Sequence, residues 1–235
     1  MKAHLRTVRL ELAEPLRISR STMTARDAVW LGVEHDGVTG YGEAVSSVYY
    51  GLDADTLVRL ISAVGVERFA DPESALEALP SGAVPPAVIA AVESALLDLV
   101  GKRDGVPVHR MLGTEASSGV ATARTIGITS PAHAAAEARR LAASGFQVIK
   151  VKAGTPDPEI EGSGTELMLG CLTASTLGLA PAVHLADRAR WTDLDGHLLL
   201  AHDPWRGIGG ADGCVRPSGR PGLGVEEVTA HADVA

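Results

Sequence analysis

Two lysines, Lys150 and Lys152, lie two positions apart in the sequence Val-Ile-Lys-Val-Lys-Ala-Gly that begins at Val148. Side chains two positions apart on a β-strand project from the same face, so both ammonium groups are expected to point the same way. Neighbouring cations in a protein interior repel each other and lose solvation, and both effects lower the pKa of an amine. A lysine with a lowered pKa can act as a general base near neutral pH. The pair therefore indicates proton transfer, and the alternative is two solvated lysines on an edge strand.

The elements around the lysines favour an interior position. A strand is expected over residues 121–128, a helix from Ser130 to Gly145, and a second strand over residues 146–151. Ser130 followed by proline is typical of a helix start, and glycine is typical of a helix end. Strand, helix and strand with short connections form a βαβ unit with parallel pairing. Parallel strands are usually covered on both faces, so Ile149 and Val151 are expected to face helices while the lysines face the other side.

Two aspartates, Asp193 and Asp195, have the same spacing at the end of a strand expected over residues 191–194. Enzymes with parallel sheets place ligand-binding groups at the carboxyl ends of their strands. Two carboxylates there could hold an ammonium group or a metal ion, and the alternative is a polar turn. A further acidic cluster lies in a proline-rich stretch and is interpreted as solvated surface; it consists of Asp157, Glu159 and Glu161.

The first third of the chain predicts an antiparallel meander with helices. Apolar and polar residues alternate over 5–12 and 28–34, and Asp36-Gly37 supplies a tight turn into a third strand. Helices are expected over residues 55–66 and 86–102. In the last third, a strand over 167–171 and a helix over 175–186, shortened by Pro181, are expected to precede a long loop over 196–225.

Composition narrows the class of protein. Apolar residues make up 46% of the chain, which is enough for a buried core, and the net charge of −8 argues against a general nucleic-acid binder. No apolar run is long enough for a membrane span, and the charged N-terminus does not resemble a signal peptide. Two cysteines cannot form a disulfide framework. We therefore expect a cytoplasmic protein that acts on a small molecule, with neither nucleic acid nor membrane as a partner.

Together, these motifs resemble the enolase superfamily in its mandelate racemase and muconate lactonizing enzyme branch, and most of all its dipeptide epimerases. The opening hairpin and the Lys-x-Lys and Asp-x-Asp motifs occur in the family's order along the chain. The matching segments are Gly40-Tyr41-Gly42-Glu43-Ala44, Leu97 to Arg103, Gly105-Val106-Pro107, Leu112-Gly113, Lys150-Val151-Lys152, Met168 to Cys171, Ser175, Leu177-Gly178, Asp193 to Gly196, Pro217 and Pro221 to Val225.

The resemblance implies an α/β plus α+β fold. An α+β capping domain would span residues 1–118, a partial β/α barrel of the TIM type, (β/α)7β, residues 119–196, and a segment returning to the cap residues 197–235. It also implies removal of a proton next to a carboxylate or amide carbonyl, through an enediolate that Mg²⁺ stabilises.

The family's site residues carry over onto six positions of this sequence. By resemblance, Lys152 is the acid and base, and Lys150 lowers its pKa. Asp193 and Asp195 hold the α-ammonium group of the substrate. Thr125 is a substrate contact, and Arg20 in the capping domain meets a substrate carboxylate.

The family's central barrel strands have no counterpart here. The stretch after Lys152 leads almost directly into the match to strand seven, so strands three to six, on the order of 120 residues, are missing. Those strands carry the family's Mg²⁺ ligands and its second catalytic lysine, so no metal ligand is assigned, and no lysine follows Lys152. We therefore expect a racemase or epimerase that is impaired or inactive. Strands two and seven would present free edges, through which two copies could pair as a homo-oligomer.

Two alternatives remain open beside an impaired epimerase. The chain could bind amino acids or dipeptides without catalysis, or it could be a shortened product that folds poorly. The branch could also be that of lactonizing enzymes or succinylbenzoate synthases, although the Asp-x-Asp motif favours dipeptide epimerases.

Overall fold

A computed structural model describes residues 1–18, 21–80, 82, 84–114, 119–152 and 168–228. The strands and helices, in chain order, are β1 (Lys2–Ile18), β2 (Ser21–His35), β3 (Val38–Val45), α1 (Ala54–Val64), α2 (Pro72–Glu77), α3 (Pro86–Asp104), α4 (Val108–Met111), β4 (Val120–Ala121), β5 (Ala123–Ile126), α5 (Pro131–Ala143), β6 (Val148–Val151), β7 (Met168–Gly170), α6 (Thr176–Val183), β8 (Trp191–Asp193), β9 (Trp205–Arg206), β10 (Cys214–Val215) and β11 (Glu226–Glu227). None of these helices has the length and apolar character needed to traverse a lipid bilayer.

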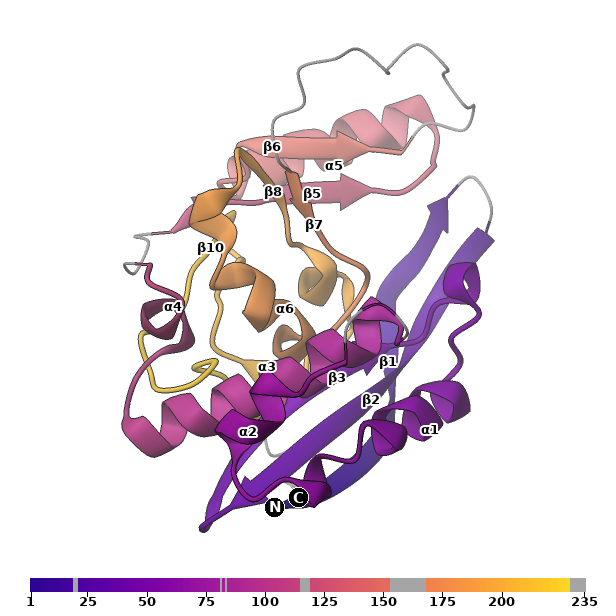
Figure 1. The fold of residues 1–235 in the computed structure, drawn as a ribbon. Helices are drawn as coiled ribbons and strands as arrows, with labels where there is room; N and C mark the ends of the chain where they lie inside the picture. The colour runs from indigo at the N-terminus through magenta and orange to yellow at the C-terminus, as the bar shows by residue number, and fades with distance from the viewer. Residues whose placement is uncertain (19–20, 81, 83, 115–118, 153–167, 229–235) are drawn as a thin grey trace, which may run out of the picture.

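The N-terminal part is the expected antiparallel meander, with strand order β1-β2-β3 (Figure 1). Asp36 and Gly37 both have positive φ angles, which form the tight turn between β2 and β3. The strands are longer than the alternation of apolar residues predicted. β1 continues past a register shift between Glu11 and Leu16, because backbone pairing to β2 resumes beyond the irregular segment that contains Pro15.

The two faces of this sheet serve different cores. Val29, Leu31 and Val33 of β2 are buried against α1 and α3 on one face (Figure 1). Ala28 and Trp30, which alternate with them, are buried against α6 and the C-terminal segment on the other face. The period of two along β2 therefore places the sheet between the helices of the cap and the rest of the molecule.

Two glycines allow α3 to lie close to β3. A Cβ atom at Gly40 would overlap the carbonyl oxygen of Ala95, and one at Gly42 would overlap that of Ala91. The spacing of the Gly-x-Gly motif thus matches a strand whose every second residue faces a helix backbone.

The second part contains the expected βαβ unit. β5 and β6 pair in parallel with α5 between them, and β7 pairs in parallel with β8. A parallel bridge between Thr122 and Thr192 joins the two pairs, so the strands follow the order β7, β8, β5, β6. The Ser130 side chain accepts a hydrogen bond from the backbone N–H of His133 at the start of α5, as the sequence predicted.

One expectation about β6 is half wrong. Ile149 packs against the apolar cluster of Ile126, Leu141 and Phe146 beneath α5, as expected. Val151 on the same face is 54% exposed, whereas it was expected to face helices. It is the last residue of β6, and it lies outside the apolar cluster that covers Ile149.

The C-terminal segment was expected to be mostly loop, and three short strands interrupt it. β10 pairs with β4, and β11 pairs with β9, each through two residues. The helix predicted over 175–186 is shortened, as expected from its proline: α6 begins at Thr176, contains Pro181 and ends at Val183. The segment also contacts the cap, because the backbone N–H of Leu223 donates to the buried carboxylate of Asp98 on α3 at 2.8 Å.

Candidate functional site

Three neighbouring parallel strands bring the predicted site residues together. Lys150 on β6 lies directly opposite Thr125 on β5, so their side chains share a face. Asp193 is the last residue of β8, the strand on the other side of β5. The carboxyl ends of β8, β5 and β6 therefore form one edge, where side chains far apart in the sequence converge.

An ion pair crosses this edge. The Lys150 ammonium group donates to Oδ2 of Asp193, 43 positions away in the chain. Burial alone would lower the pKa of Lys150, but the hydrogen bond and the charge of Asp193 outweigh it, and the pKa is raised. Lys150 is therefore held in its charged form.

Lys152 behaves in the opposite way. Burial, and then the positive charge and hydrogen bonding of Lys150, lower the pKa of Lys152. No carboxylate among the described residues forms an ion pair with it. The amine thus has the environment that the spacing of the two lysines predicted, in which one of them loses basicity.

Asp195 contacts a different strand. Its Oδ2 accepts a hydrogen bond from the backbone N–H of Thr125 at 2.7 Å and lies 3.3 Å from a guanidinium nitrogen of Arg124. Arg124 also donates to the carbonyl oxygen of Leu198 at 2.9 Å. Sequence reasoning missed Arg124 because it alternates with Thr125 and belongs to the opposite face of β5. The position of Arg124 in the sequence gives no indication that the Asp195 side chain contacts it.

The two aspartates therefore engage separate cations of the chain. Both are buried, at 3% and 2% exposed. The second oxygen of Asp193, Oδ1, is buried and has no hydrogen-bond partner among the described residues. The shared role of Asp193 and Asp195 in holding a substrate ammonium group stays a prediction. Arg20, Asp157, Glu159 and Glu161 lie outside the described residues.

The described residues do not fit Mg²⁺. This ion requires about six oxygen ligands in near-octahedral geometry. Among the residues that the structure describes, no group of three His, Cys, Asp or Glu side chains could hold a metal ion. The two carboxylates at the strand ends are already paired with Lys150 and Arg124.

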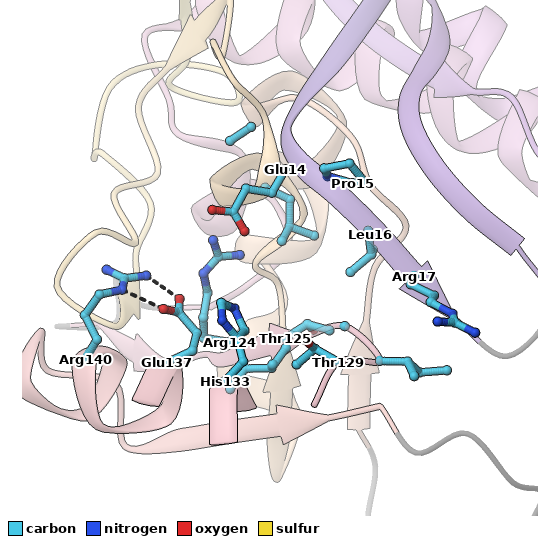
Figure 2. A pocket seen from close by; sticks show the side chains of 15 residues that line it. Glu14, Pro15, Leu16, Arg17, Arg124, Thr125, Thr129, His133, Glu137 and Arg140 are labelled. Carbon is cyan, nitrogen blue, oxygen red and sulfur yellow. Dashed lines mark hydrogen bonds and ion pairs between the residues drawn. The ribbon is translucent and has the colours of Figure 1, made fainter. Parts of the chain in front are cut away.

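A cavity of about 380 Å³ lies next to this edge, between β1 and α5 (Figure 2). Thr125 lines it, but neither lysine of the pair is among its lining residues. Glu137 on its wall is held by Arg140, whose Nε donates at 2.8 Å. The cavity is therefore a neighbour of the lysine site and not the site itself.

The buried carboxylate of Glu43 links the cap to α6, the helix that follows β7. Glu43 on β3 accepts hydrogen bonds from the indole N–H of Trp30 at 2.7 Å, from the backbone N–H of Ser175 at 2.9 Å and from the Ser175 hydroxyl. Burial raises the pKa of Glu43, and these donors oppose the rise. Ser175 is also the N-cap of α6. Sequence reasoning placed both residues in motifs but gave neither a role, because the contact spans 132 positions.

Comparison with known proteins agrees with this architecture. Residues 1–113 match the family model described as the mandelate racemase / muconate lactonizing enzyme, N-terminal domain. The L-Ala-D/L-Glu epimerase of Bacteroides thetaiotaomicron is 34% identical over 149 residues, which cover 62% of this chain and 39% of that protein. The L-Ala-D/L-amino acid epimerase of a Maribacter species is 31% identical, over 66% of this chain and 46% of that protein. The chain thus matches less than half the length of these curated relatives.

Solved structures give the same fold. The substrate-liganded L-Ala-D/L-Glu epimerase from Bacillus subtilis superposes with a TM-score of 0.83 at 19% identity, covering 97% of this chain and 99% of that one. The dipeptide epimerase from Methylococcus capsulatus, complexed with Mg and the dipeptide L-Arg-D-Lys, gives a TM-score of 0.82 at 22% identity, covering 95% and 98%. The capping domain and these matches lead to one conclusion: residues 1–113 match the N-terminal domain of the mandelate racemase and muconate lactonizing enzyme family, and the chain is similar in sequence and fold to dipeptide epimerases of the enolase superfamily.

Proposed function

We propose that this chain has an epimerase-type site for a dipeptide or amino-acid derivative, that Lys152 can transfer a proton on one face of that ligand, and that the chain does not epimerise it. The observation that carries the proposal is the position of Lys152 beside Lys150, which holds its positive charge through Asp193 and lowers the pKa of its neighbour. A poorly solvated amine of reduced basicity at the strand ends suits a general base.

The substrate class follows from the relatives, whose names describe epimerisation of dipeptides. In this proposal Lys150 keeps Lys152 less basic, and Thr125, Asp193, Asp195 and Arg20 contact the substrate. We expect this chemistry on a small molecule in the cytoplasm. No step is assigned to Mg²⁺, because the described residues do not fit that ion.

Epimerisation needs a proton-transferring group on each face of the substrate's α-carbon, and this chain supplies such a group on one face only. Only 15 residues separate Lys152 from Met168, the residue at which β7 begins. A single strand-helix unit takes on the order of 30 residues, so this connection cannot contain the four units that would complete a barrel of eight strands. No lysine follows Lys152 anywhere in the sequence. The opposite face of a bound substrate therefore lacks a lysine from this chain.

The test is incubation with L-Ala-L-Glu in D₂O, followed by proton NMR for loss of the α-proton and chiral chromatography for the D-epimer. We expect no D-epimer, and any deuterium at the α-carbon should enter with retained configuration. A Lys152→Met variant should abolish such exchange, whereas Lys2→Met, which removes an exposed lysine at the start of β1, should not change it. Formation of the D-epimer that depends on Lys152 would overturn the proposal.

A second candidate function is binding without chemistry, and one observation favours it. Oδ1 of the buried Asp193 carboxylate lacks a hydrogen-bond partner among the described residues, so an ammonium group of a ligand would satisfy an acceptor that these residues leave unpaired. Under this alternative, a dipeptide binds to the wild-type chain and more weakly to Asp193→Asn, and no deuterium enters the α-position even after long incubation.

A further inference from the structure

The ion pair between Lys150 and Asp193 spans β5, so its geometry depends on how β8 is attached to β5. In the described part of the chain, these two strands share one backbone bridge, between Thr122 and Thr192. By comparison, β5 pairs with β6 through four residues of each strand, and β7 pairs with β8 through three. The backbone ladder is therefore shortest at the junction on which the ion pair depends.

Two threonine hydroxyl groups add side-chain contacts to the junction between β5 and β8. The backbone N–H of Leu194 donates to Oγ1 of Thr122 at 2.8 Å, and Oγ1 of Thr192 donates to the carbonyl oxygen of Ala121 at 2.7 Å. Thr122 and Leu194 are fully buried, and Thr192 is 5% exposed. A buried N–H or carbonyl group is costly to leave unpaired, so these two bonds should fix the backbone at the junction.

The two bonds lie on either side of Asp193 along the chain. Thr192 precedes Asp193 and Leu194 follows it, so both neighbours are tied to the segment that contains β5. β5 in turn pairs directly with β6, the strand of Lys150. On its other side β8 pairs with β7, and β7 does not pair with β6 among the described strands. The threonine hydroxyls therefore connect the backbone around Asp193 to the strand that positions Lys150.

The titration of Lys150 reports where Asp193 lies. Among the described residues, the titratable groups that act on Lys150 are Asp193, Asp195, Cys171 and the neighbouring Lys152. Burial is the largest influence on the pKa of Lys150 and lowers it, and the hydrogen bond and the charge of Asp193 come next and raise it. A displaced Asp193 would therefore leave burial less opposed.

We propose that Thr122 and Thr192 are positioning residues of this site, whose hydroxyl groups hold the end of β8 where the Asp193 carboxylate meets Lys150. The inference rests on the proposed function for the reaction that the site carries, and adds what places its ion pair. In the part of the chain that the structure describes, no hydrogen bond joins either threonine to a lysine, so both act through Asp193.

The test is the NMR titration of the Lys150 side chain in Thr122→Val, in which a methyl group replaces the hydroxyl and the branched shape is kept. The buried N–H of Leu194 then loses its acceptor, and the end of β8 should shift. We expect the pKa of Lys150 to fall below its wild-type value. Thr122→Ser, which keeps a hydroxyl, should bring it back toward that value, and Thr192→Val should lower it as Thr122→Val does.

Thr176→Val is the matched control, because it also removes a buried threonine hydroxyl. Thr176 is 2% exposed, and its Oγ1 donates to Asp203 at 2.6 Å at the start of α6, outside the junction of β5 and β8. This variant should lower the urea midpoint without changing the titration of Lys150. Urea unfolding also shows which variants are folded, and Thr192→Val retains the test if Thr122→Val does not fold.

An unchanged titration of Lys150 in a folded Thr122→Val or Thr192→Val would overturn the inference for that residue, and an equal shift in Thr176→Val would overturn it for both. The D₂O experiment tests the proposed proton transfer separately. A lowered pKa of Lys150 in Thr122→Val, with no exchange in the wild type, would refute the proton transfer and leave the positioning role standing. Exchange in the wild type with an unchanged titration in Thr122→Val and Thr192→Val would do the reverse.

Discussion

Lys150 on β6 and Asp193 on β8 form an ion pair across the intervening strand β5, and this pair fixes the charge of the site. Burial pulls the pKa of Lys150 down, and Asp193 more than compensates. The charged Lys150 in turn lowers the pKa of Lys152.

Replacing Asp193 should therefore change the titration of Lys150. In Asp193→Asn, burial remains while the opposing charge is lost, so the pKa of Lys150 should fall below its wild-type value. The chain has only four lysines, which allows each to be followed by NMR of its side-chain carbon and nitrogen atoms. Asp212→Asn is the matched control, because Asp212 is exposed and pairs with Arg216. An unchanged titration of Lys150 in Asp193→Asn would contradict the ion pair.

Ser175 should contribute more to stability than an ordinary helix cap. In Ser175→Ala, α6 loses its N-cap and Glu43 loses a hydroxyl donor in a buried site. We expect the free energy of unfolding to fall by about 2–3 kcal/mol, the sum of a cap and a hydrogen bond to a charged group. Ser130→Ala removes only the cap of α5 and should cost about 1 kcal/mol. Urea unfolding compares the two, and equal losses would mean that the contact between Glu43 and Ser175 adds nothing.

Asp98 should hold the C-terminal segment on the cap. Its buried carboxylate accepts hydrogen bonds from the backbone N–H groups of Tyr41 and Leu223, each at 2.8 Å, and from Lys102 at 2.7 Å. Asp98→Asn replaces one acceptor with a donor that faces another donor, so the free energy of unfolding should drop by about 2–3 kcal/mol. Asp104→Asn at the exposed end of the same helix should change it by less than about 0.5 kcal/mol. Similar urea midpoints for the two variants would refute this role.

His184 should make the chain sensitive to mild acid. Its Nδ1 accepts from the backbone N–H of His109 at 2.9 Å, so Nε2 carries the proton and lies 3.1 Å from the Leu223 carbonyl oxygen. Burial lowers the pKa of His184 from 6.5 to about 4. The unfolded chain therefore binds a proton that the folded chain excludes, and the free energy of unfolding falls as the pH drops from 6.5 toward 4.

The full effect of His184 is on the order of 3 kcal/mol, at about 1.4 kcal/mol for each pKa unit. The measurement is urea unfolding at several pH values down to about 5, above the range in which most carboxylates titrate. His184→Gln should flatten the dependence. Buried His197, whose pKa burial also lowers, leaves a smaller slope of the same sign. A wild-type slope retained in His184→Gln would contradict the assignment.

Local patterns were sufficient to predict the elements that position the site. Alternating apolar residues marked the meander, Asp36-Gly37 marked its turn, and Ser130 with Pro131 marked the start of α5, because each effect acts within a few residues. The two-residue strands β9, β10 and β11 were not predicted, since two residues are too few to show a period.

The contacts between elements could not be predicted in the same way. The lysine spacing predicted a shared face and a lowered pKa, and it could not show that Asp193 would pair with Lys150. The contact of Asp195 with Arg124 depends on how β8 ends beside β5, and the one between Glu43 and Ser175 depends on how the cap meets α6. These depend on tertiary packing, which no spacing within a single segment records.

The most direct measurement of the central claim is the NMR titration of the Lys152 side chain in the wild-type chain and in Lys150→Met. We predict that the pKa of Lys152 in the wild-type chain lies below the ordinary lysine value of 10.5, and that Lys150→Met raises it toward that value. If the pKa of Lys152 is not lowered and does not respond to the loss of Lys150, the two lysines do not share a site, and the account is contradicted.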